Sequence, residues 1–384
     1  MSTGVERDAW GFYLHVPFCA TRCGYCDFNT YTAAELGPGA DRATYADTLI
    51  AEITLARESL PQAPPIDTVF FGGGTPTLIG ADDLVRVLAS LRATFGLSPD
   101  AEVTTEANPD SVNASALETL REGGFTRMSF GVQSLVPQVL AVLERTHTPG
   151  RSLAAIVEAR AAGFEHVSAD LIYATPGETD EDLRTSVAQV LDAGVDHISA
   201  YSLIVEDGTR LAARVRRGEI PAPDDDVAAE RYVLIDEMAS AAGLPWYEVS
   251  NWAVPGSECR HNLGYWRGSA WWGAGPGAHG FVQGRRWWNH KHPATYAAAV
   301  GRGELPVAGD EVLTAHEITV ESIMLGTRLR EGLPLAKVEG PALDELAADG
   351  LVETRDAAMV LTDRGRLLAD AVVRRLLDEP PSSQ

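Results

Sequence analysis

The chain has 384 residues, a length typical of two or three domains. Apolar residues make up 45% and charged residues 22%, which is ordinary globular usage and excludes a disordered chain. There are 31 basic and 54 acidic side chains, giving a formal net charge of −23. This balance excludes broad binding to nucleic-acid phosphates, which needs clustered Lys and Arg, so we expect no nucleic-acid partner.

Strand-like and helix-like segments alternate from residue 11 to about residue 251. The predicted strands are Gly11–Val16, Ile66–Phe71, Ala101–Ala107, Arg127–Val132, His166–Tyr173 and His197–Ile204. The predicted helices between them are Tyr45–Leu60, Ala81–Phe95, Ser115–Gly123, Ser152–Ala162 and Glu181–Ala193. This alternation predicts an α/β fold, either an open doubly wound sheet or a partial (β/α)6 barrel. We favour the barrel, because polar residues follow many strand C-terminal ends, where barrel active sites lie.

The composition changes after a further predicted helix at Val227–Ala242. Seven of the eight tryptophans lie between Trp246 and Trp288. The tail then shows helix, turn and helix, followed by predicted strands at Leu351–Glu353 and Met359–Leu361 and a last helix at Asp363–Leu377. We therefore expect a barrel over residues 1–250, an aromatic-rich connecting region over 251–313 and a smaller α/β, winged-helix-like C-terminal domain over 314–384.

The sequence shows no sign of export or of a membrane span. No apolar run approaches the ~18–20 residues that cross a bilayer. The N-terminal segment MSTGVERDAW lacks the apolar core of a signal peptide. We therefore expect a cytoplasmic protein, in which clustered cysteines indicate a metal or redox site rather than disulfides.

Three of the four cysteines, Cys19, Cys23 and Cys26, follow the first predicted strand with the spacing C-x3-C-x2-C. Thiolates are good ligands for zinc, copper(I) and iron–sulfur clusters, but a structural zinc normally takes four protein ligands. Three cysteines leave one iron of a [4Fe–4S] cluster free to chelate S-adenosylmethionine (SAM). An electron from the cluster can then cleave the sulfonium to a 5′-deoxyadenosyl radical. Zinc and free thiols remain alternatives for this spacing taken alone.

Other motifs follow the next strands. In FFGGGTPT, over 70–77, the glycines let the backbone approach a ligand closely, although a tight βα turn is the alternative. Glu106, Gln133 and Asp170 lie at the next three strand ends, where they suit ligand hydroxyl or amide groups, and Arg145 suits a carboxylate. Each alone is compatible with an ordinary structural hydrogen bond, but their shared location favours one joint site.

Together these motifs resemble the radical SAM superfamily, whose members share a partial (β/α) barrel. The blocks YLHVPFC, CDFNTY, FGGGTPT, EANPD, SFGVQS, DLIYATPGET, AYSLIVEDGT and HNLGYWRG are similar to the branch containing oxygen-independent coproporphyrinogen III oxidase and the HemW family of heme chaperones. The resemblance places SAM contacts at Tyr13, Tyr25, Gly73, Gly74, Thr75, Glu106, Gln133, Arg145 and Asp170.

Two departures from the oxidase favour the chaperone family. Asp27 stands where the oxidase has a further Cys, and only 18 residues precede Cys19, whereas the oxidase has a long extension there. The resemblance therefore implies a protein that binds heme and delivers it to acceptors such as membrane respiratory enzymes, with an electron donor for the cluster. A coproporphyrinogen-decarboxylating radical oxidase and a radical methyltransferase are the alternatives, so the sequence leaves open whether the protein is an enzyme.

The aromatic region supplies the candidates for heme contact. Heme is a flat apolar macrocycle whose iron takes His, Cys, Met or Tyr. The candidates here are His261, Tyr265, His279 and Cys259, of which His261 and Tyr265 lie in the HNxxY motif that the resemblance associates with heme binding. Core packing of the tryptophans and surface positions for the histidines are the alternative.

Overall fold

A computed structural model describes residues 9–36, 41–338 and 340–378. The two ends of the chain, residues 1–8 and 379–384 of the first and last predicted domains, lie outside these ranges.

The centre of the structure is a run of six parallel strands. They are β1 (Trp10–Val16), β2 (Ile66–Gly73), β3 (Leu97–Ala107), β4 (Arg127–Gln133), β5 (His166–Tyr173) and β6 (His197–Ser202). Each pairs with the next in the chain, so their spatial order equals their sequence order. A doubly wound sheet would reverse this order at a switch point. The predicted partial barrel is therefore confirmed.

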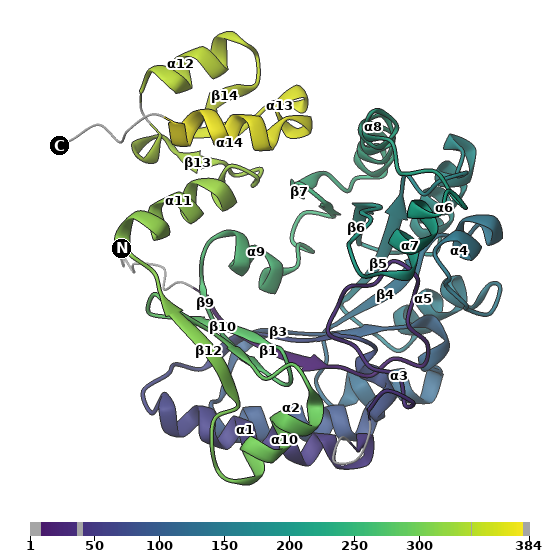
Figure 1. Cartoon of the computed structure of the whole chain (residues 1–384), viewed down its shortest axis with the longest axis vertical. Coiled ribbons are helices and arrows are strands. Elements are labelled where there is room, and N and C mark those ends of the chain that lie inside the picture. The colour runs from purple at the N-terminus through teal and green to yellow at the C-terminus, as the bar shows by residue number, and fades with distance from the viewer. Residues whose placement is uncertain (1–8, 37–40, 339, 379–384) are drawn as a thin grey trace.

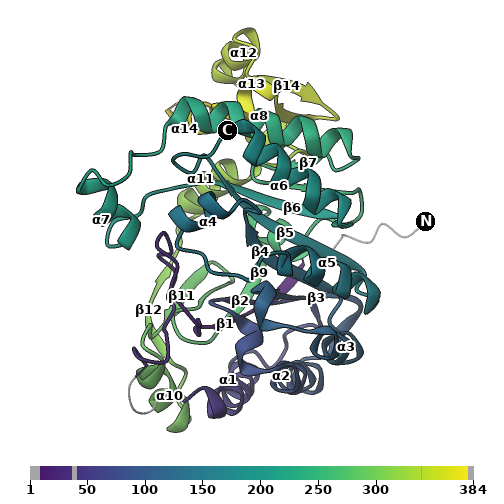
Figure 2. The same ribbon diagram turned by 90° about the vertical axis from the view of Figure 1, so that its right-hand side faces the viewer.

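Helices alternate with these strands and follow the last of them (Figures 1 and 2). They are α1 (Tyr45–Ser59), α2 (Ala81–Thr94), α3 (Ala114–Glu122), α4 (Pro137–Val142), α5 (Arg151–Ala161), α6 (Asp180–Asp192), α7 (Arg210–Arg216) and α8 (Asp225–Ala241). Most of them cover the outer side of the sheet, whereas the short α4 and α7 pack together beside the ends of β5 and β6. The short α4 and α7 escaped the sequence analysis, because six or seven residues give too little helical periodicity. Asn113, Thr179 and Asp224 cap the N-termini of α3, α6 and α8 with their side chains.

Further strands widen this sheet at both edges, and it has twelve strands among the described residues. Strands β7 (Trp246–Glu248) and β8 (Asn251–Ala253) follow β6. On the other side β9 (Ala270–Ala274) pairs in parallel with β1, and β10 (His279–Val282), β11 (Arg285–Asn289) and β12 (Val307–Val312) continue antiparallel. Helices α9 (Arg260–Trp266) and α10 (Pro293–Gly301) complete this region. Residues 251–313 thus extend the wall of the barrel.

The two faces of the strands differ in chemistry, since neighbouring side chains point to opposite faces. Phe12 and Leu14 of β1 and Phe130 of β4 are fully buried in the layer between sheet and helices. The intervening Tyr13 and Ser129 line the interior of the barrel. The outer face therefore forms the core, and the inner face remains available for a ligand.

The C-terminal domain has a hydrophobic core of its own. It comprises α11 (Ala315–Gly326), β13 (Leu333–Pro334), α12 (Pro341–Ala348), β14 (Val352–Arg355), β15 (Ala358–Leu361), α13 (Asp363–Leu367) and α14 (Ala369–Asp378). The single last helix expected at Asp363–Leu377 is wrong, because Leu368 leaves the helical conformation and separates α13 from α14. This break accompanies the burial of Arg366 against the barrel, where it pairs with Asp236 of α8.

Candidate functional site: a cysteine loop beside a polar barrel cavity

The loop after β1 carries the three clustered cysteines as free thiols. Backbone hydrogen bonds close its base, from Cys19 N to Tyr31 O at 3.0 Å and from Tyr31 N to Pro17 O at 2.7 Å. Asn29 anchors the far side, donating through Nδ2 to the carbonyls of Pro276 and Lys291, each at 2.9 Å. The cysteine loop is thus held between β1 and the added strands at the barrel edge.

The glycine-rich segment lies directly against this cysteine loop. Gly74 N donates to Val16 O at 2.8 Å, and Thr75 N donates to Phe18 O at 2.7 Å. Gly73 has φ +115°, which favours glycine, and its N–H donates to Glu106 Oε2 at 3.1 Å. All three amides are therefore used within the protein and fix the segment against the loop.

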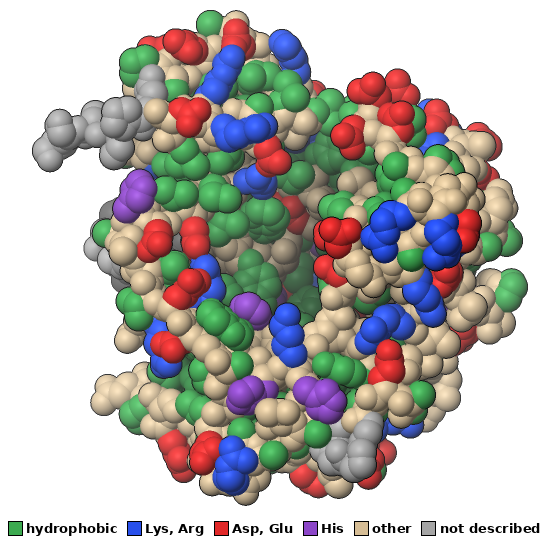
Figure 3. Space-filling model, in the orientation of Figure 1, with side chains coloured by type: hydrophobic (Ala, Val, Ile, Leu, Met, Phe, Trp, Pro, Cys, Tyr) green, Lys and Arg blue, Asp and Glu red, His purple; other side chains and the backbone are tan. Residues whose placement is uncertain are grey.

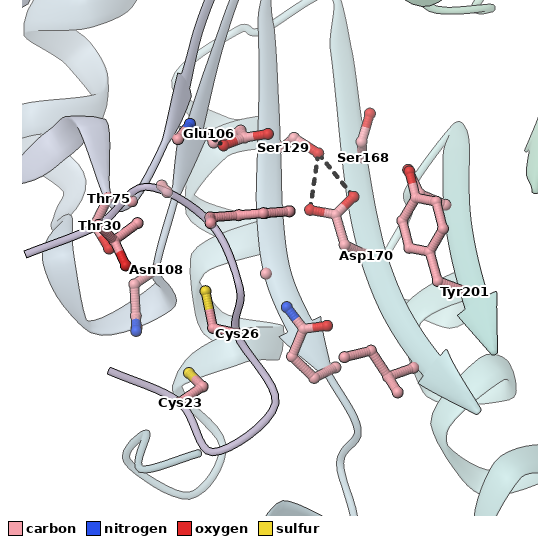
Figure 4. Close-up of a pocket in the computed structure, with 18 of the residues that line it drawn as sticks. Cys23, Cys26, Thr30, Thr75, Glu106, Asn108, Ser129, Ser168, Asp170 and Tyr201 are labelled. Atoms are coloured by element: carbon pink, nitrogen blue, oxygen red, sulfur yellow. Dashed lines mark hydrogen bonds between the residues drawn. The ribbon is translucent and has the colours of Figure 1, made fainter. Parts of the chain in front are cut away.

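The cysteines and the predicted SAM contacts line one cavity of about 480 Å³ inside the barrel. The contacts in question are Tyr13, Tyr25, Gly73, Gly74, Thr75, Glu106, Gln133, Arg145 and Asp170. Figure 4 shows Cys23 and Cys26 on their loop, across the cavity from Glu106 and Asp170. The tertiary structure therefore brings together residues that span more than a hundred positions of the sequence.

Two carboxylates face each other from the sheet side of the cavity. Burial, and then the nearby charge of Asp170, raises the pKa of Glu106 to about 8. Burial likewise raises the pKa of Asp170 to about 6, although Ser129 Oγ donates to it at 3.1 Å. A cationic ligand would relieve this repulsion, and SAM, with its sulfonium and ammonium groups, is such a ligand.

Gln133 and Arg145 are positioned by the backbone near the end of β4. Gln133 has φ +66° and lies at an irregularity in the pairing of β4 with β5, which turns its side chain into the cavity. Arg145 donates through Nη2 to Gly131 O at 2.8 Å and through Nη1 to Cys23 Sγ at 3.3 Å. This guanidinium therefore joins the end of β4 to the cysteine loop.

These residues fit a [4Fe–4S] cluster with SAM beside it. Three soft thiol ligands line one cavity, and a cation stands next to one of them. Burial, and then the charge of Cys26, raises the pKa of Cys19 to about 11. Ligation by iron would favour its thiolate form.

The heme candidates separate into two places. His261 and Cys259 are buried and line the cavity together with Tyr265, whereas His279 is exposed on β10, outside the cavity lining. His261 uses both ring nitrogens, with Nδ1 2.8 Å from Thr68 Oγ1 and Nε2 2.8 Å from the Tyr265 hydroxyl. Burial lowers the pKa of His261 to about 4. Hydrogen bonds therefore hold the imidazole of the HNxxY motif in the wall of the cavity.

Sequence reasoning missed several polar side chains that line the same cavity. They include Ser129, Ser168, Ser199, Tyr201 and Asn251. Ser129 and Ser168 are direct neighbours in the β4–β5 register. The alternation of side chains along a strand could have placed them on the interior face, since each lies two residues before a residue that lines the cavity. A serine alone, however, does not indicate a ligand contact.

Comparisons with known proteins agree with this geometry. The chain matches the Radical SAM superfamily over residues 13–190 and the HemN C-terminal domain over 313–368. It is 57% identical to the heme chaperone HemW of Mycobacterium tuberculosis over 96% of this chain and 95% of that protein. It is 33% identical to the heme chaperone HemW of Bacillus subtilis, over 96% and 99%.

Among solved structures, coproporphyrinogen III oxidase HemN of Escherichia coli, a radical SAM enzyme, has the same fold. The TM-score is 0.82 at 22% identity, over 96% of this chain and 90% of that one. In the part of the chain that the structure describes, no helix has the length and apolar character needed to cross a bilayer. The long, high-identity matches establish that this chain belongs to the HemW family within the radical SAM superfamily.

Proposed function

We propose that this protein is a heme chaperone that holds a [4Fe–4S] cluster on Cys19, Cys23 and Cys26 and binds SAM in the adjoining cavity. The observation that carries the cofactor part is that all three thiols and all nine expected SAM contacts line one cavity. The cargo part is supported by the 57% identity to a heme chaperone over nearly the whole of both chains.

Different residues of the cavity suit different chemical groups of SAM. When bound, the cluster supplies an electron and an open coordination position for SAM. The carbonyls of the glycine-rich segment suit the ammonium group, and Glu106 and Asp170 suit hydroxyl groups and positive charge. Arg145 suits the carboxylate of the methionine part, because its guanidinium already points at the cysteine loop.

The cluster is tested by iron and sulfide analysis of anaerobically reconstituted protein. We expect about four irons per chain, because three cysteines suit a [4Fe–4S] cluster. Replacing Cys19, Cys23 and Cys26 together with Ser should remove them. Cys259→Ser is the matched control, since that thiol is buried near Glu102 and lies off the loop. A triple variant that keeps its cluster, or native protein that prefers a single zinc, contradicts the proposal.

SAM binding is tested best at Asp170, which lies across the cavity from the cysteines (Figure 4). Asp170→Asn keeps the shape of the side chain but removes its charge. We expect weaker SAM binding by calorimetry with an unchanged iron content. Gly73 is a poorer test, because a Cβ there would meet Val16 O at 2.9 Å and would disturb the cysteine loop as well. Equal SAM affinity in native protein and Asp170→Asn would remove Asp170 from the site.

The heme-carrying function is separated from oxidase activity by two assays on the same preparation. We expect heme to bind with a shifted Soret band, and we expect no conversion of coproporphyrinogen III to protoporphyrinogen IX. We also expect transfer of bound heme to an acceptor protein such as a membrane respiratory enzyme. Asp27 and the high identity to heme chaperones support this choice. Robust conversion, with release of carbon dioxide and 5′-deoxyadenosine, would establish the oxidase instead.

A further inference from the structure

A half-exposed aromatic surface lies on the added strands, next to the barrel cavity. Its side chains, Trp271, His279, Phe281 and Trp288, are called the aromatic shelf here. The register places them on one face, since Phe281 pairs with Trp271 and His279 pairs with Trp288. Trp271, Phe281 and Trp288 are half-buried, and His279 is exposed. The shelf is therefore an aromatic surface with one accessible imidazole.

The aromatic shelf continues the inner face of the barrel. Tyr13 of β1, which lines the cavity, pairs with Gly273 of β9, two residues after Trp271 and on the same face. Tyr265 joins the two regions, because its ring lies 4.8 Å from that of Trp271 in an edge contact. Figure 3 shows hydrophobic side chains and a histidine gathered beside the central hollow over this part of the sheet. A ligand on the shelf would lie at the edge of the cofactor cavity.

Charged side chains of both signs border the aromatic shelf. Partial burial, and then the charges of Arg286 and Lys291, lower the pKa of His279, and the charge of Glu311 opposes them. The guanidinium of Arg286 is paired with Glu311 at 3.0 Å and with Glu321 at 2.7 Å. The cation at the edge of the shelf is therefore already neutralised by carboxylates.

The histidines of this region differ in what they can offer a metal. His261 has both ring nitrogens engaged, as described above. His292 accepts the N–H of Ala294 at the start of α10. His279 is exposed, with its ring 6.0 Å from that of Trp288 at 32°. An accessible imidazole beside flat aromatic rings matches two parts of heme, namely the iron and the macrocycle.

We propose that heme binds on the aromatic shelf, with His279 as the axial ligand of its iron. This location rests on the heme-carrying function proposed above. It leaves the barrel cavity to SAM, so that both ligands are held side by side.

The test is a set of anaerobic titrations of the cluster-loaded full chain with heme and with iron-free protoporphyrin IX. His279→Ala should shift the Soret maximum and weaken heme binding about tenfold or more, with protoporphyrin IX affinity unchanged. Imidazole added to His279→Gly should restore the native Soret position. His316→Ala, which removes another exposed histidine, is the control and should bind heme like the native chain.

The other parts of the aromatic shelf have their own readouts. Trp271→Leu with Trp288→Leu should weaken both porphyrins, because the stacking surface is shared. SAM binding should stay native in every variant, which also checks folding. If native protein binds heme and the His279 and tryptophan variants bind it equally well, the location is wrong. If native protein binds no heme, the proposed function fails first.

Discussion

Gly74 lies at the closest approach of the two loops that build the site. A Cβ at this position would lie 2.5 Å from Phe18 O and 3.0 Å from Cys19 Sγ. Because the first of these neighbours is backbone, it cannot yield by a side-chain rotation. The need for glycine here comes from the packing of the cysteine loop, which the sequence motif alone does not show.

Gly74→Ala should therefore displace the cysteine loop. We expect a loss of about 1–3 kcal/mol in the free energy of unfolding, as for other overpacked sites, together with a lower iron content after reconstitution. Gly301→Ala is the control, because a Cβ there meets nothing within 4 Å and the residue ends α10. Full iron loading and native stability of Gly74→Ala would show that the loop has room to adjust.

Glu106 makes the stability of the folded chain depend on pH. Its folded-state pKa of about 8 exceeds the ordinary 4.5, chiefly because of burial. Between these pH values the folded state keeps a proton that the unfolded state has released. The stability from this group is therefore fully present below about pH 4.5 and is lost as pH rises to about 8.

Glu106→Gln should remove that dependence, because an amide does not ionise. We expect the urea midpoint of the cofactor-free native chain to fall more between pH 5 and pH 8.5 than that of Glu106→Gln. Glu122→Gln, on the exposed surface of α3, should follow the native chain. Parallel curves for the native chain and Glu106→Gln would mean that the carboxylate is already ionised in the folded state.

Helix α1 is tied to the added strands by a single carboxylate. Glu52 is fully buried and accepts hydrogen bonds from Gly275 N at 2.8 Å, Asn289 Nδ2 at 2.9 Å and the Tyr296 hydroxyl at 2.5 Å. Gly275 precedes Pro276, whose carbonyl holds the cysteine loop through Asn29. Glu52 therefore links the helix layer, the added strands and the cysteine loop.

Glu52→Ala should remove the acceptor of Gly275 N and of the Tyr296 hydroxyl, whereas Asn289 Nδ2 keeps the carbonyl of Gly275 at 3.0 Å. We expect a loss of about 2 kcal/mol or more in the free energy of unfolding, since each unsatisfied buried group costs about 1–3 kcal/mol. Glu58→Ala, on the exposed side of the same helix, should change it by no more than about 0.5 kcal/mol. Chemical unfolding of the two variants measures the difference, and equal stability would show that water replaces the carboxylate.

The C-terminal domain is joined to the barrel through Arg366. This buried guanidinium pairs with Asp236 of α8 at 2.7 Å and lies 4.7 Å from the ring centre of Trp246. Asp236 also accepts the indole N–H of Trp252 at 2.8 Å. One side chain of α13 thus holds a helix and two strands of the other domain.

Arg366→Ala should uncouple the two domains. Breaking a buried ion pair leaves an uncompensated charge and costs about 3–5 kcal/mol. We expect easier unfolding and faster proteolysis between β12 and α11, with SAM binding retained, because Arg366 does not line the cavity. Arg364→Ala, which removes an exposed neighbour on α13, should resist protease like the native chain. Protease resistance of Arg366→Ala would place the main domain contact elsewhere.

The sequence by itself predicted the barrel and a set of residues that share its cavity. Alternating strand and helix periodicity is local, and the bounds of β5 coincide with the predicted His166–Tyr173. The cysteine spacing and the glycine-rich segment are each a short continuous stretch of sequence, so their chemistry can be predicted without knowing the fold. Their convergence on one cavity followed from parallel pairing, which places the strand ends at one mouth.

Only the tertiary structure decided the role of the aromatic region. The pairing of Trp10 in β1 with Ala270 in β9 joins distant parts of the chain, and no local pattern specifies such a contact. That pairing places Trp271 and His279 on a surface continuous with the barrel interior. It also encloses His261 between Thr68 and Tyr265, where hydrogen bonds occupy both of its ring nitrogens. Two histidines of one region, His261 and His279, thus have different environments, because the burial of a side chain depends on which strands meet in space.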